Sequence, residues 1–306
     1  MNIYTITLNP AFDIHCSSDM LAIGRENFVA ITSRDAGGKG VNISRALLQN
    51  GIENTALVAV GNENAPEFCK SLEAVGMKIF PLETDGRIRE NFTFHTKGAP
   101  ETRISFDGFC ADHSLLDRCA DYLNTRINPQ TIVTFTGSIP KGISIEDAKR
   151  FLNGIRQFGA RIVVDCRSFT LNDLIELQPW LIKPNQEEIS GYLGREITSF
   201  EDARFGAEKL FQAGISNVMI SLGKEGAMLV CGEGFYTVRA PKLSSVVSTI
   251  GAGDSSIAGF LDAVSNKKSM PDCLKTAVAY GSAACLTDGT NPPRQEDIKR
   301  LLLQIK

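Results

Sequence analysis

The chain has 306 residues, of which 43% are hydrophobic and 22% charged, a composition typical of globular proteins. Its 32 basic and 35 acidic side chains give a formal net charge of −3, so the chain as a whole lacks the basic footprint of nucleic-acid and anionic-membrane binders. No apolar run approaches the roughly 20 residues that span a bilayer. We therefore expect no binding to nucleic acid or membrane.

The cysteines and the amino terminus indicate a cytoplasmic protein. Eight cysteines are scattered without a C-x-x-C pair, which favours reduced thiols over a disulfide framework. The first apolar run is interrupted at Asn9 and Pro10 and has no basic segment before it, unlike a secretory signal. The three histidines form no cluster of zinc-binding spacing with the cysteines, so we expect no zinc held by the protein alone.

Short β-branched runs alternate with segments of helical periodicity along the chain. The strand-like runs are 3–8, 55–60, 131–136, 161–165, 180–183 and 217–222, and apolar residues follow helical spacing in 41–48, 145–158 and 203–211. This alternation predicts an α/β fold with a mostly parallel sheet covered on both faces by helices. The ligand crevice is then expected at the carboxyl ends of the strands.

Two early segments, 13–33 and 87–107, do not follow this alternation. Polar and apolar residues alternate on both sides of the turn Lys97-Gly98-Ala99-Pro100, which predicts a β-hairpin. With 13–33, this hairpin would form a small sheet that covers the crevice, here called the lid. The predicted domains are a main domain of residues 1–12, 34–86 and 108–306 and a lid of residues 13–33 and 87–107.

The predicted hairpin has one apolar face, formed by Phe92 and Phe94 on one arm and Ile104 and Phe106 on the other. A small sheet is stable only when such a face is covered. A second copy of the lid would cover it through a two-fold interface, which predicts a homodimer. The alternative is a lid folded onto its own main domain.

A glycine-rich loop, Gly37-Gly38-Lys39-Gly40, precedes the helical segment 41–48. Glycines allow a close approach of backbone to a ligand, and free amides at a helix start favour oxyanions or hydroxyls. A tight loop with a solvated lysine explains the same residues equally well. The spacing matches neither the usual P-loop nor a dinucleotide-binding fingerprint.

The segment Gly251-Ala252-Gly253-Asp254 precedes a helix expected to end near Ser265. Consecutive amides there would stabilise charge on a transferring phosphoryl group, and the Asp254 carboxylate could accept a hydroxyl proton. An ordinary helix cap is the alternative reading.

Asn185 and Glu188 follow the strand-like run 180–183 and begin another helical segment. Their spacing is typical of a capping box. Polar groups at the carboxyl end of a strand also hold metal-bound water or nucleotide phosphate, so both readings remain open.

Seven motifs together resemble the PfkB (ribokinase-like) carbohydrate kinase family over the chain from Ile3 to about Thr290. The opening motif and Arg89-Glu-Asn91 resemble its hexose-phosphate branch, 1-phosphofructokinase and tagatose-6-phosphate kinase. The motifs are Asn9-Pro-Ala-Phe-Asp13, Gly37-Gly-Lys-Gly-Val-Asn42, Arg89-Glu-Asn91, Thr136-Gly-Ser-Ile-Pro-Lys-Gly142, Lys183-Pro-Asn-Gln-Glu-Glu188, Ser221-Leu-Gly-Lys-Glu-Gly226 and Gly251-Ala-Gly-Asp254.

The resemblance implies a ribokinase-like three-layer α/β/α fold with an inserted β-sheet lid, and pairing of two copies through that lid. It also implies Mg²⁺-dependent phosphorylation of a ketohexose phosphate by ATP, with fructose 1-phosphate giving fructose 1,6-bisphosphate. Tagatose 6-phosphate and fructose 6-phosphate remain alternative acceptors. A non-catalytic sugar-phosphate sensor on the same fold is the alternative of a different class.

The same resemblance implies a role for each matching residue. Asp254 matches the catalytic base, and Gly251, Ala252 and Gly253 match the anion hole. The acceptor-binding positions are Asp13, Gly38, Lys39, Asn42, Arg89, Arg103 and Ser138. The nucleotide-binding positions are Lys183, Asn185, Ser221, Gly223 and Ser248, and Glu188 is linked to Mg²⁺ through water. Cys166 and Arg167 depart from the family pattern Asp-Thr-Ser-Gly, and Ile88 from a common threonine.

Overall fold

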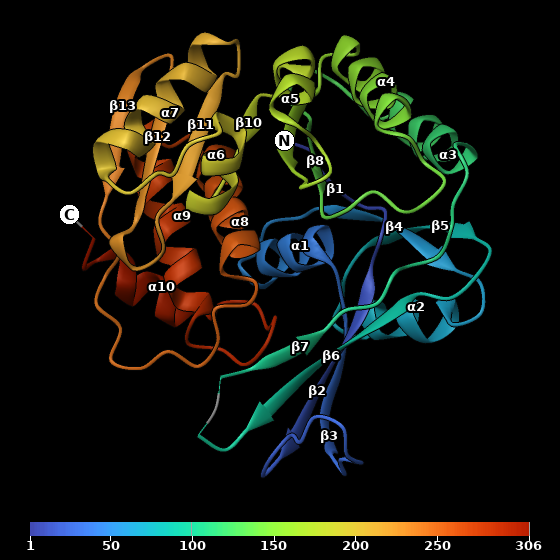
Figure 1. Cartoon of the computed structure of the whole chain (residues 1–306). Helices are drawn as coiled ribbons and strands as arrows, with labels where there is room; N and C mark the ends of the chain where they lie inside the picture. Colours follow the sequence, from blue (N-terminus) through green and yellow to red (C-terminus); the bar gives the residue numbers. More distant parts are fainter. Residues whose placement is uncertain (99, 306) are drawn as a thin grey trace.

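The computed structural model describes residues 1–98 and 100–305, in which nine strands form a central sheet (Figure 1). Its strands, in spatial order, are β13 (Gly234–Val238), β12 (Ala227–Cys231), β11 (Asn217–Ser221), β10 (Leu181–Ile182), β9 (Arg161–Asp165), β8 (Ile132–Thr136), β1 (Ile3–Thr7), β4 (Thr55–Gly61) and β5 (Ile79–Thr84). All neighbours from β5 to β11 are parallel, whereas β12 and β13 continue the sheet as antiparallel strands. The predicted mostly parallel sheet is confirmed.

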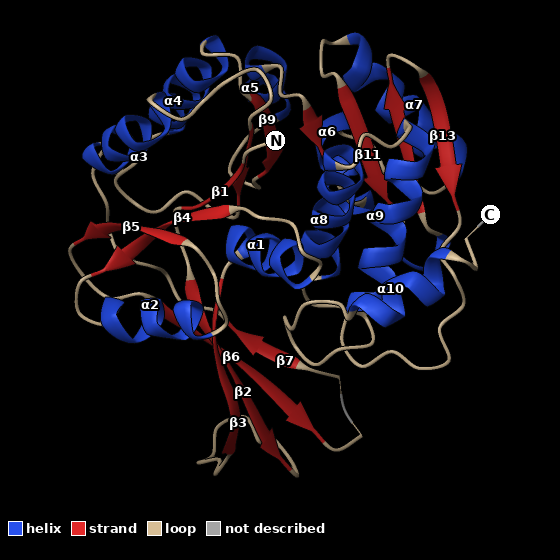
Figure 2. Ribbon diagram, turned by 180° about the vertical axis from the view of Figure 1, so that it is seen from behind, coloured by secondary structure: helices blue, strands red, loops and turns tan. Residues whose placement is uncertain are grey.

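Helices cover both faces of this sheet, so the three-layer architecture is confirmed (Figure 2). Side chains within a strand alternate between two cores; in β9, Ile162 and Val164 belong to one and Val163 to the other. The helices of one layer are α1 (Lys39–Gln49), α2 (Ala65–Ala74), α8 (Ala252–Ser265), α9 (Met270–Ala284) and α10 (Gln295–Leu302), and both views draw α1 and α2 on the same side of β4 and β5 (Figures 1 and 2). The helices of the other are α3 (Ser114–Asn124), α4 (Ile145–Gln157), α5 (Leu171–Leu177), α6 (Gln186–Leu193) and α7 (Phe200–Gln212).

A second sheet projects from one end of the main body in both views (Figures 1 and 2). Its strands, in spatial order, are β3 (Ala30–Gly37), β2 (Ala11–Ser18), β6 (Arg89–Thr96) and β7 (Thr102–Ile104). This sheet, called the small sheet below, contains strands from both segments of the predicted lid. Strands β6 and β7 pair antiparallel with Phe92 opposite Ile104, which confirms the predicted hairpin. Ala99 of the predicted turn lies outside the described residues. Strands β2 and β3 reach Ala11 and Gly37, so the small sheet is continuous with the loops that border the main sheet.

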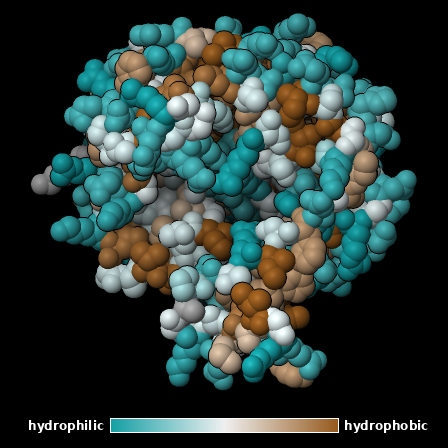
Figure 3. All heavy atoms as spheres, in the orientation of Figure 1, coloured by the Kyte–Doolittle hydropathy of each residue, from teal (hydrophilic) through white to brown (hydrophobic). Residues whose placement is uncertain are grey.

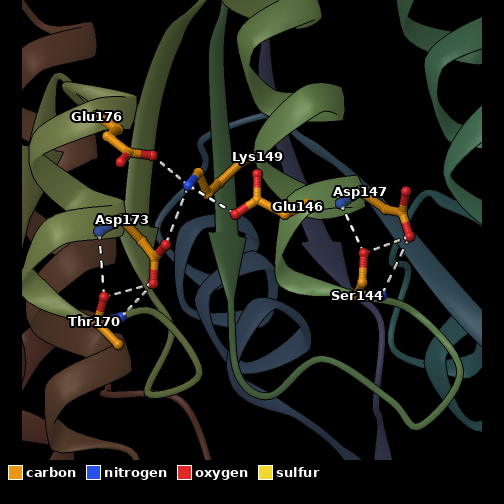
Figure 4. A network of polar contacts seen from close by, with 7 residues as sticks. All are labelled: Ser144, Glu146, Asp147, Lys149, Thr170, Asp173 and Glu176. Carbon is orange, nitrogen blue, oxygen red and sulfur yellow. Dashed lines mark hydrogen bonds and ion pairs between the residues drawn. The ribbon is translucent and has the colours of Figure 1, made fainter.

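A buried lysine joins α4 and α5 beside the main sheet (Figure 4). Lys149 lies on α4 with only 8% of its surface exposed, and its ammonium contacts Glu146 on the same helix and Asp173 and Glu176 on α5. Asp173 also closes a capping box with Thr170 at the start of α5. This network fixes the end of the loop that connects β9 to α5, and that loop borders the site described below.

No helix among the described residues is long and apolar enough to cross a membrane.

Candidate active site

A cleft of about 600 Å³ lies at the carboxyl ends of the main strands, bordered on one side by the small sheet. It brings together most of the predicted site residues: Asp13, Gly38, Lys39, Asn42, Arg89, Arg103, Ser138, Lys183, Asn185, Glu188, Ser221, Gly251, Gly253 and Asp254. The predicted residues Ala252, Gly223 and Ser248 do not line it. The Ser248 hydroxyl instead accepts a hydrogen bond from the Ile250 amide at 3.2 Å, which stabilises the turn before the Gly251 loop.

The glycine-rich loop places the first turn of α1 beside the cleft. Gly38 has a φ of +131°, and a Cβ there would lie 2.7 Å from the Thr7 Cγ2 atom, so only glycine allows this close approach to β1. Lys39, the first residue of α1, points its ammonium toward Asp165, with 2.9 Å between Nζ and Oδ2. The lysine of this loop is therefore ion-paired inside the cleft rather than solvated.

Asp254 lies in the first turn of α8 and is buried, with 7% of its surface exposed. Asn42 of α1 donates a hydrogen bond to its Oδ2 atom at 2.8 Å. Burial raises the pKa of the Asp254 carboxyl to about 6, although Lys39 and the Asn42 hydrogen bond favour the charged form. A carboxylate with a pKa near neutrality is suited to accept a proton in catalysis. Asp254 is also an acidic residue in the first turn of α8, which agrees with the structural reading, although in the described chain no side-chain hydrogen bond caps the helix at Gly251.

A second buried carboxylate, Asp165, lies between two lysines at the end of β9. Burial opposes its charge, but Lys183 and Lys39 hold its pKa below the ordinary value. Its Oδ1 atom is 4.0 Å from the Lys183 ammonium. A Cβ at Gly253 would lie 3.2 Å from that ammonium, so Lys183 stands beside the first turn of α8. Two cations and the amides of a helix start thus converge next to Asp254, an arrangement that favours an anion there.

The small sheet supplies a charged polar surface on the opposite side of the cleft. The Asp13 carboxylate accepts hydrogen bonds from Asn91 Nδ2 at 3.1 Å and from Arg103 Nη2 at 2.8 Å. Arg89 donates to the backbone carbonyls of Asn9, Pro10 and Phe106. The guanidinium of Arg103 is therefore placed to meet a ligand, whereas that of Arg89 mainly fixes the surrounding backbone.

Asn185 and Glu188 form a complete capping box at the start of α6. The Asn185 Oδ1 atom accepts from the Glu188 amide at 2.8 Å, and Glu188 Oε2 accepts from the Asn185 amide at 3.0 Å. Arg167 donates its Nε hydrogen to the other carboxylate oxygen of Glu188 at 3.0 Å. The structural role predicted for this pair is confirmed, and both residues still line the cleft.

The side chains of the cleft show how a magnesium ion could be held there. Among the described residues, no group of three or more His, Cys, Asp or Glu side chains could hold a metal ion. Both Glu188 oxygens have protein partners, so this carboxylate fits a metal only through an intervening water. A hard cation such as Mg²⁺ keeps several waters and takes its other oxygens from substrate phosphates. The site therefore fits a metal that arrives with a nucleotide.

Several cleft residues were not among the predicted site residues, although motifs quoted above include some of them. Asn9 donates from Nδ2 to the Ser138 hydroxyl at 3.0 Å, and Asn91 binds Asp13. Asp165, Arg167 and Thr290 also line the cleft. Asp165 could have been found from the sequence, because an acidic residue directly after a buried strand faces the crevice of a parallel sheet. Thr290 carries no comparable sequence pattern.

Comparisons with known proteins agree with this geometry. Residues 24–297 match the family described as pfkB family carbohydrate kinase. The 1-phosphofructokinase of Vibrio cholerae is 30% identical over 304 residues, which cover 99% of this chain and 96% of that protein. The solved structure of phosphofructokinase-2 from Escherichia coli with substrates and products has a TM-score of 0.92 at 26% identity and covers 99% of both chains. The same protein in complex with fructose-6-phosphate has a TM-score of 0.90 at 25% identity, covering 99% of this chain and 98% of that one.

Proposed function

Because the chain belongs to the pfkB family of carbohydrate kinases, we propose that it transfers the γ-phosphoryl group of ATP to fructose 1-phosphate, giving fructose 1,6-bisphosphate. The chain is a sugar kinase, and ATP is the phosphate donor of that family. The observation that carries the acceptor assignment is Arg103, held by Asp13 on the small sheet and facing a cleft that contains Asp254. The similarity to proteins named 1-phosphofructokinase supports the same acceptor.

The proposed reaction uses Asp254 as the general base. Its carboxylate takes the proton of the C6 hydroxyl, and the hydroxyl oxygen forms a bond to the γ-phosphorus of ATP. The bond from that phosphorus to the bridging oxygen breaks, and ADP leaves with the electron pair. Charge on the transferring group is stabilised by the amides of Gly251 and Gly253 at the start of α8 and by the nearby Lys183. Asn42 orients the base through its hydrogen bond.

Magnesium belongs to the same proposal. Glu188 would hold the ion through water while the nucleotide phosphates supply the other oxygens. Bound there, Mg²⁺ neutralises phosphate charge and helps to orient the nucleotide. Lys183 and Asn185, between β10 and α6, would lie beside the same phosphates.

The arginine pair gives the proposal its specificity for a phosphorylated acceptor. The Arg103 side chain is 40% exposed, and its planar guanidinium can bind two phosphate oxygens at once. In our proposal Arg89 acts beside it by holding the backbone at Asn9, Pro10 and Phe106. Fructose 6-phosphate is the second candidate acceptor, because phosphofructokinase-2, a structure of high similarity, binds it.

An ADP-release assay over a panel of acceptors tests the proposal. Fructose 1-phosphate should give the highest kcat/KM, above fructose 6-phosphate, tagatose 6-phosphate and free fructose. A higher kcat/KM for fructose 6-phosphate would show that this second candidate is the acceptor. Equal activity on free fructose would contradict the proposal that the cleft recognises the phosphate group of the acceptor. If no acceptor stimulates ATP turnover while sugar phosphates still raise the melting temperature, the protein is a sensor.

We also propose that two copies pair through their small sheets. Figure 3 shows hydrophobic side chains on the projecting sheet. Ile31 of β3 is 64% exposed, and Ile104 of β7 is 48% exposed. The polar face of the sheet, with Asp13 and Arg103, is already directed into the cleft, so the apolar face is the one left for a partner.

Light scattering at micromolar concentration tests this pairing. The wild type should have the mass of a dimer, and Ile104→Asp should have the mass of a monomer. Exposed Phe158→Asp, a substitution on the main body, serves as the control and should leave the dimer intact. A monomeric wild type, or a dimeric Ile104→Asp variant, would contradict the interface.

A further inference from the structure

Arg167 is an arginine in the cleft to which the proposed reaction assigns no role. It lies in the loop between β9 and α5, and its side chain is 70% exposed while lining the cleft. In the part of the chain that the structure describes, only its Nε atom donates to a protein group, the Glu188 carboxylate. The two terminal nitrogens of the guanidinium are therefore available to a ligand.

The surrounding structure holds this side chain in place before any ligand binds. Glu188 is fixed by the capping box with Asn185. At one end of the Arg167 loop, Asp165 is buried and paired with Lys39. At the other end, Thr170 and Asp173 cap α5, and Asp173 is joined to Lys149 (Figure 4). A guanidinium held in this way loses little side-chain freedom when it binds an anion.

Its neighbours place Arg167 on the donor side of the cleft. Glu188 lies in the first turn of α6, and the N-cap residue of that helix, Asn185, forms a β-bridge with Ser221 at the end of β11. The groups that would hold the acceptor, Asp13 and Arg103, belong instead to the small sheet. A phosphate chain that reaches the first turn of α8 would thus have Lys183 beside it and Arg167 at the edge of the cleft.

We propose that Arg167 binds phosphate oxygens of the nucleoside triphosphate and thereby lets this enzyme bind ATP without a divalent cation. The inference rests on the proposed function, since it assumes that ATP occupies the donor side. The planar guanidinium matches phosphate geometry, and its ion pair with Glu188 leaves both terminal nitrogens free to donate. A permanent cation at this place supplies part of the positive charge that a metal otherwise brings.

Calorimetric titration of ATP in excess EDTA tests the inference. Removing a hydrogen bond to a charged group costs about 1.5–3 kcal/mol, so Arg167→Ser should bind ATP at least about ten-fold more weakly than the wild type. Arg167→Lys keeps the charge and should recover part of the affinity, whereas Arg167→Gln should resemble the serine variant. AMP, which lacks the outer phosphates, should bind all variants equally.

Arg150 on α4 provides a matched control. It also donates to the carboxylate of a capping box, with 3.3 Å between its Nη1 atom and Asp147 Oδ1, but it lies outside the cleft. Arg150→Ser should leave ATP affinity unchanged. Melting temperatures of all variants should match the wild type, because both arginine side chains are largely exposed.

Three results would overturn the inference. The first is equal ATP affinity of Arg167→Ser and the wild type in EDTA. The second is a loss of fructose 1-phosphate affinity without a loss of ATP affinity, which would place Arg167 on the acceptor side. The third is a wild type that binds ATP only with Mg²⁺. A wild type that binds ATP under neither condition would refute the proposed function instead.

Discussion

Replacing Asp254 by asparagine separates catalysis from stability, because the two should change in opposite directions. The substitution removes the proposed base, so kcat should fall at least ~100-fold, the low end of general-base contributions. KM should change little, because the side-chain carbonyl of the introduced asparagine still accepts the hydrogen bond that Asn42 donates to Asp254 Oδ2 in the wild type.

The stability effect follows from the burial of the charge. Burial raises the pKa of Asp254 from the ordinary value of 3.8 to about 6. Native protein thus binds the proton more tightly than unfolded protein, and stability falls as pH rises from about 4 to about 6. Above pH 6 the cost is constant, on the order of 3 kcal/mol for that difference in pKa. Asp254→Asn should therefore raise the free energy of unfolding at pH 7 by up to that amount.

The two effects need two measurements. Urea unfolding followed by the fluorescence of the single Trp180 gives stability, and kcat/KM between pH 5 and 8 gives the titration of the base. Wild-type kcat/KM should decline below about pH 6, where Asp254 becomes protonated. Asp272→Asn is the control, because Asp272 is also a first-turn acid, on α9 and outside the cleft. A variant Asp254→Asn that keeps wild-type kcat and gains no stability would refute the reasoning.

Three further substitutions test other parts of the structure. Arg103→Ala should raise KM for fructose 1-phosphate at least about ten-fold, since it removes a charge-assisted contact, and leave KM for ATP unchanged in steady-state kinetics; an unchanged KM for the sugar phosphate would return Arg103 to a purely structural role. Gly289→Ala should lower stability by about 1–3 kcal/mol in urea unfolding, because Gly289 has a φ of +56° and a new Cβ would lie 2.7 Å from His15 Nε2; full stability would mean that the loop shifts freely. Lys149→Met should lower the melting temperature without changing either KM, because it leaves three carboxylates facing one another between α4 and α5; an unchanged melting temperature would show that the network in Figure 4 contributes nothing measurable.

The alternation of strands and helices could be predicted from the sequence because the central strands of the main sheet are short apolar runs buried on both faces. The run 161–165 coincides with β9, and the predicted end of the helix near Ser265 coincides with the end of α8. The run 180–183 gives only the short β10, Leu181–Ile182, because Lys183 already turns its side chain into the cleft. Strand β5 was not among the runs named, since Pro81 and exposed side chains interrupt its apolar pattern.

The pairings inside the site could not be predicted from the sequence. The spacing of the motifs shows that several loops meet at one edge of a parallel sheet. It gives neither the strand register of the small sheet nor the angles at which the helices of the main domain cross. Arg103 binds Asp13 across 90 residues, and Asn42 binds Asp254 across 212. The capping box of Asn185 and Glu188 was predictable, because all of its contacts lie within one turn.

The charges of the cleft explain why Asp254 and Asp165 behave differently although both are buried. Asp165 has the Lys39 ammonium at 2.9 Å and the Lys183 ammonium at 4.0 Å, so its pKa stays below the ordinary value. Among the described residues, only the neutral Asn42 donates a hydrogen bond to Asp254, and burial raises its pKa to about 6 although Lys39 favours the charged form. In the proposed reaction, the proton of the acceptor hydroxyl should therefore go to Asp254 and not to Asp165. In that reaction the Lys39 and Lys183 side chains, held close to Asp165, would lie beside the transferring phosphoryl group. The proposed mechanism thus divides the work between the two carboxylates: Asp254 accepts the proton, and Asp165 holds the two lysine side chains in position.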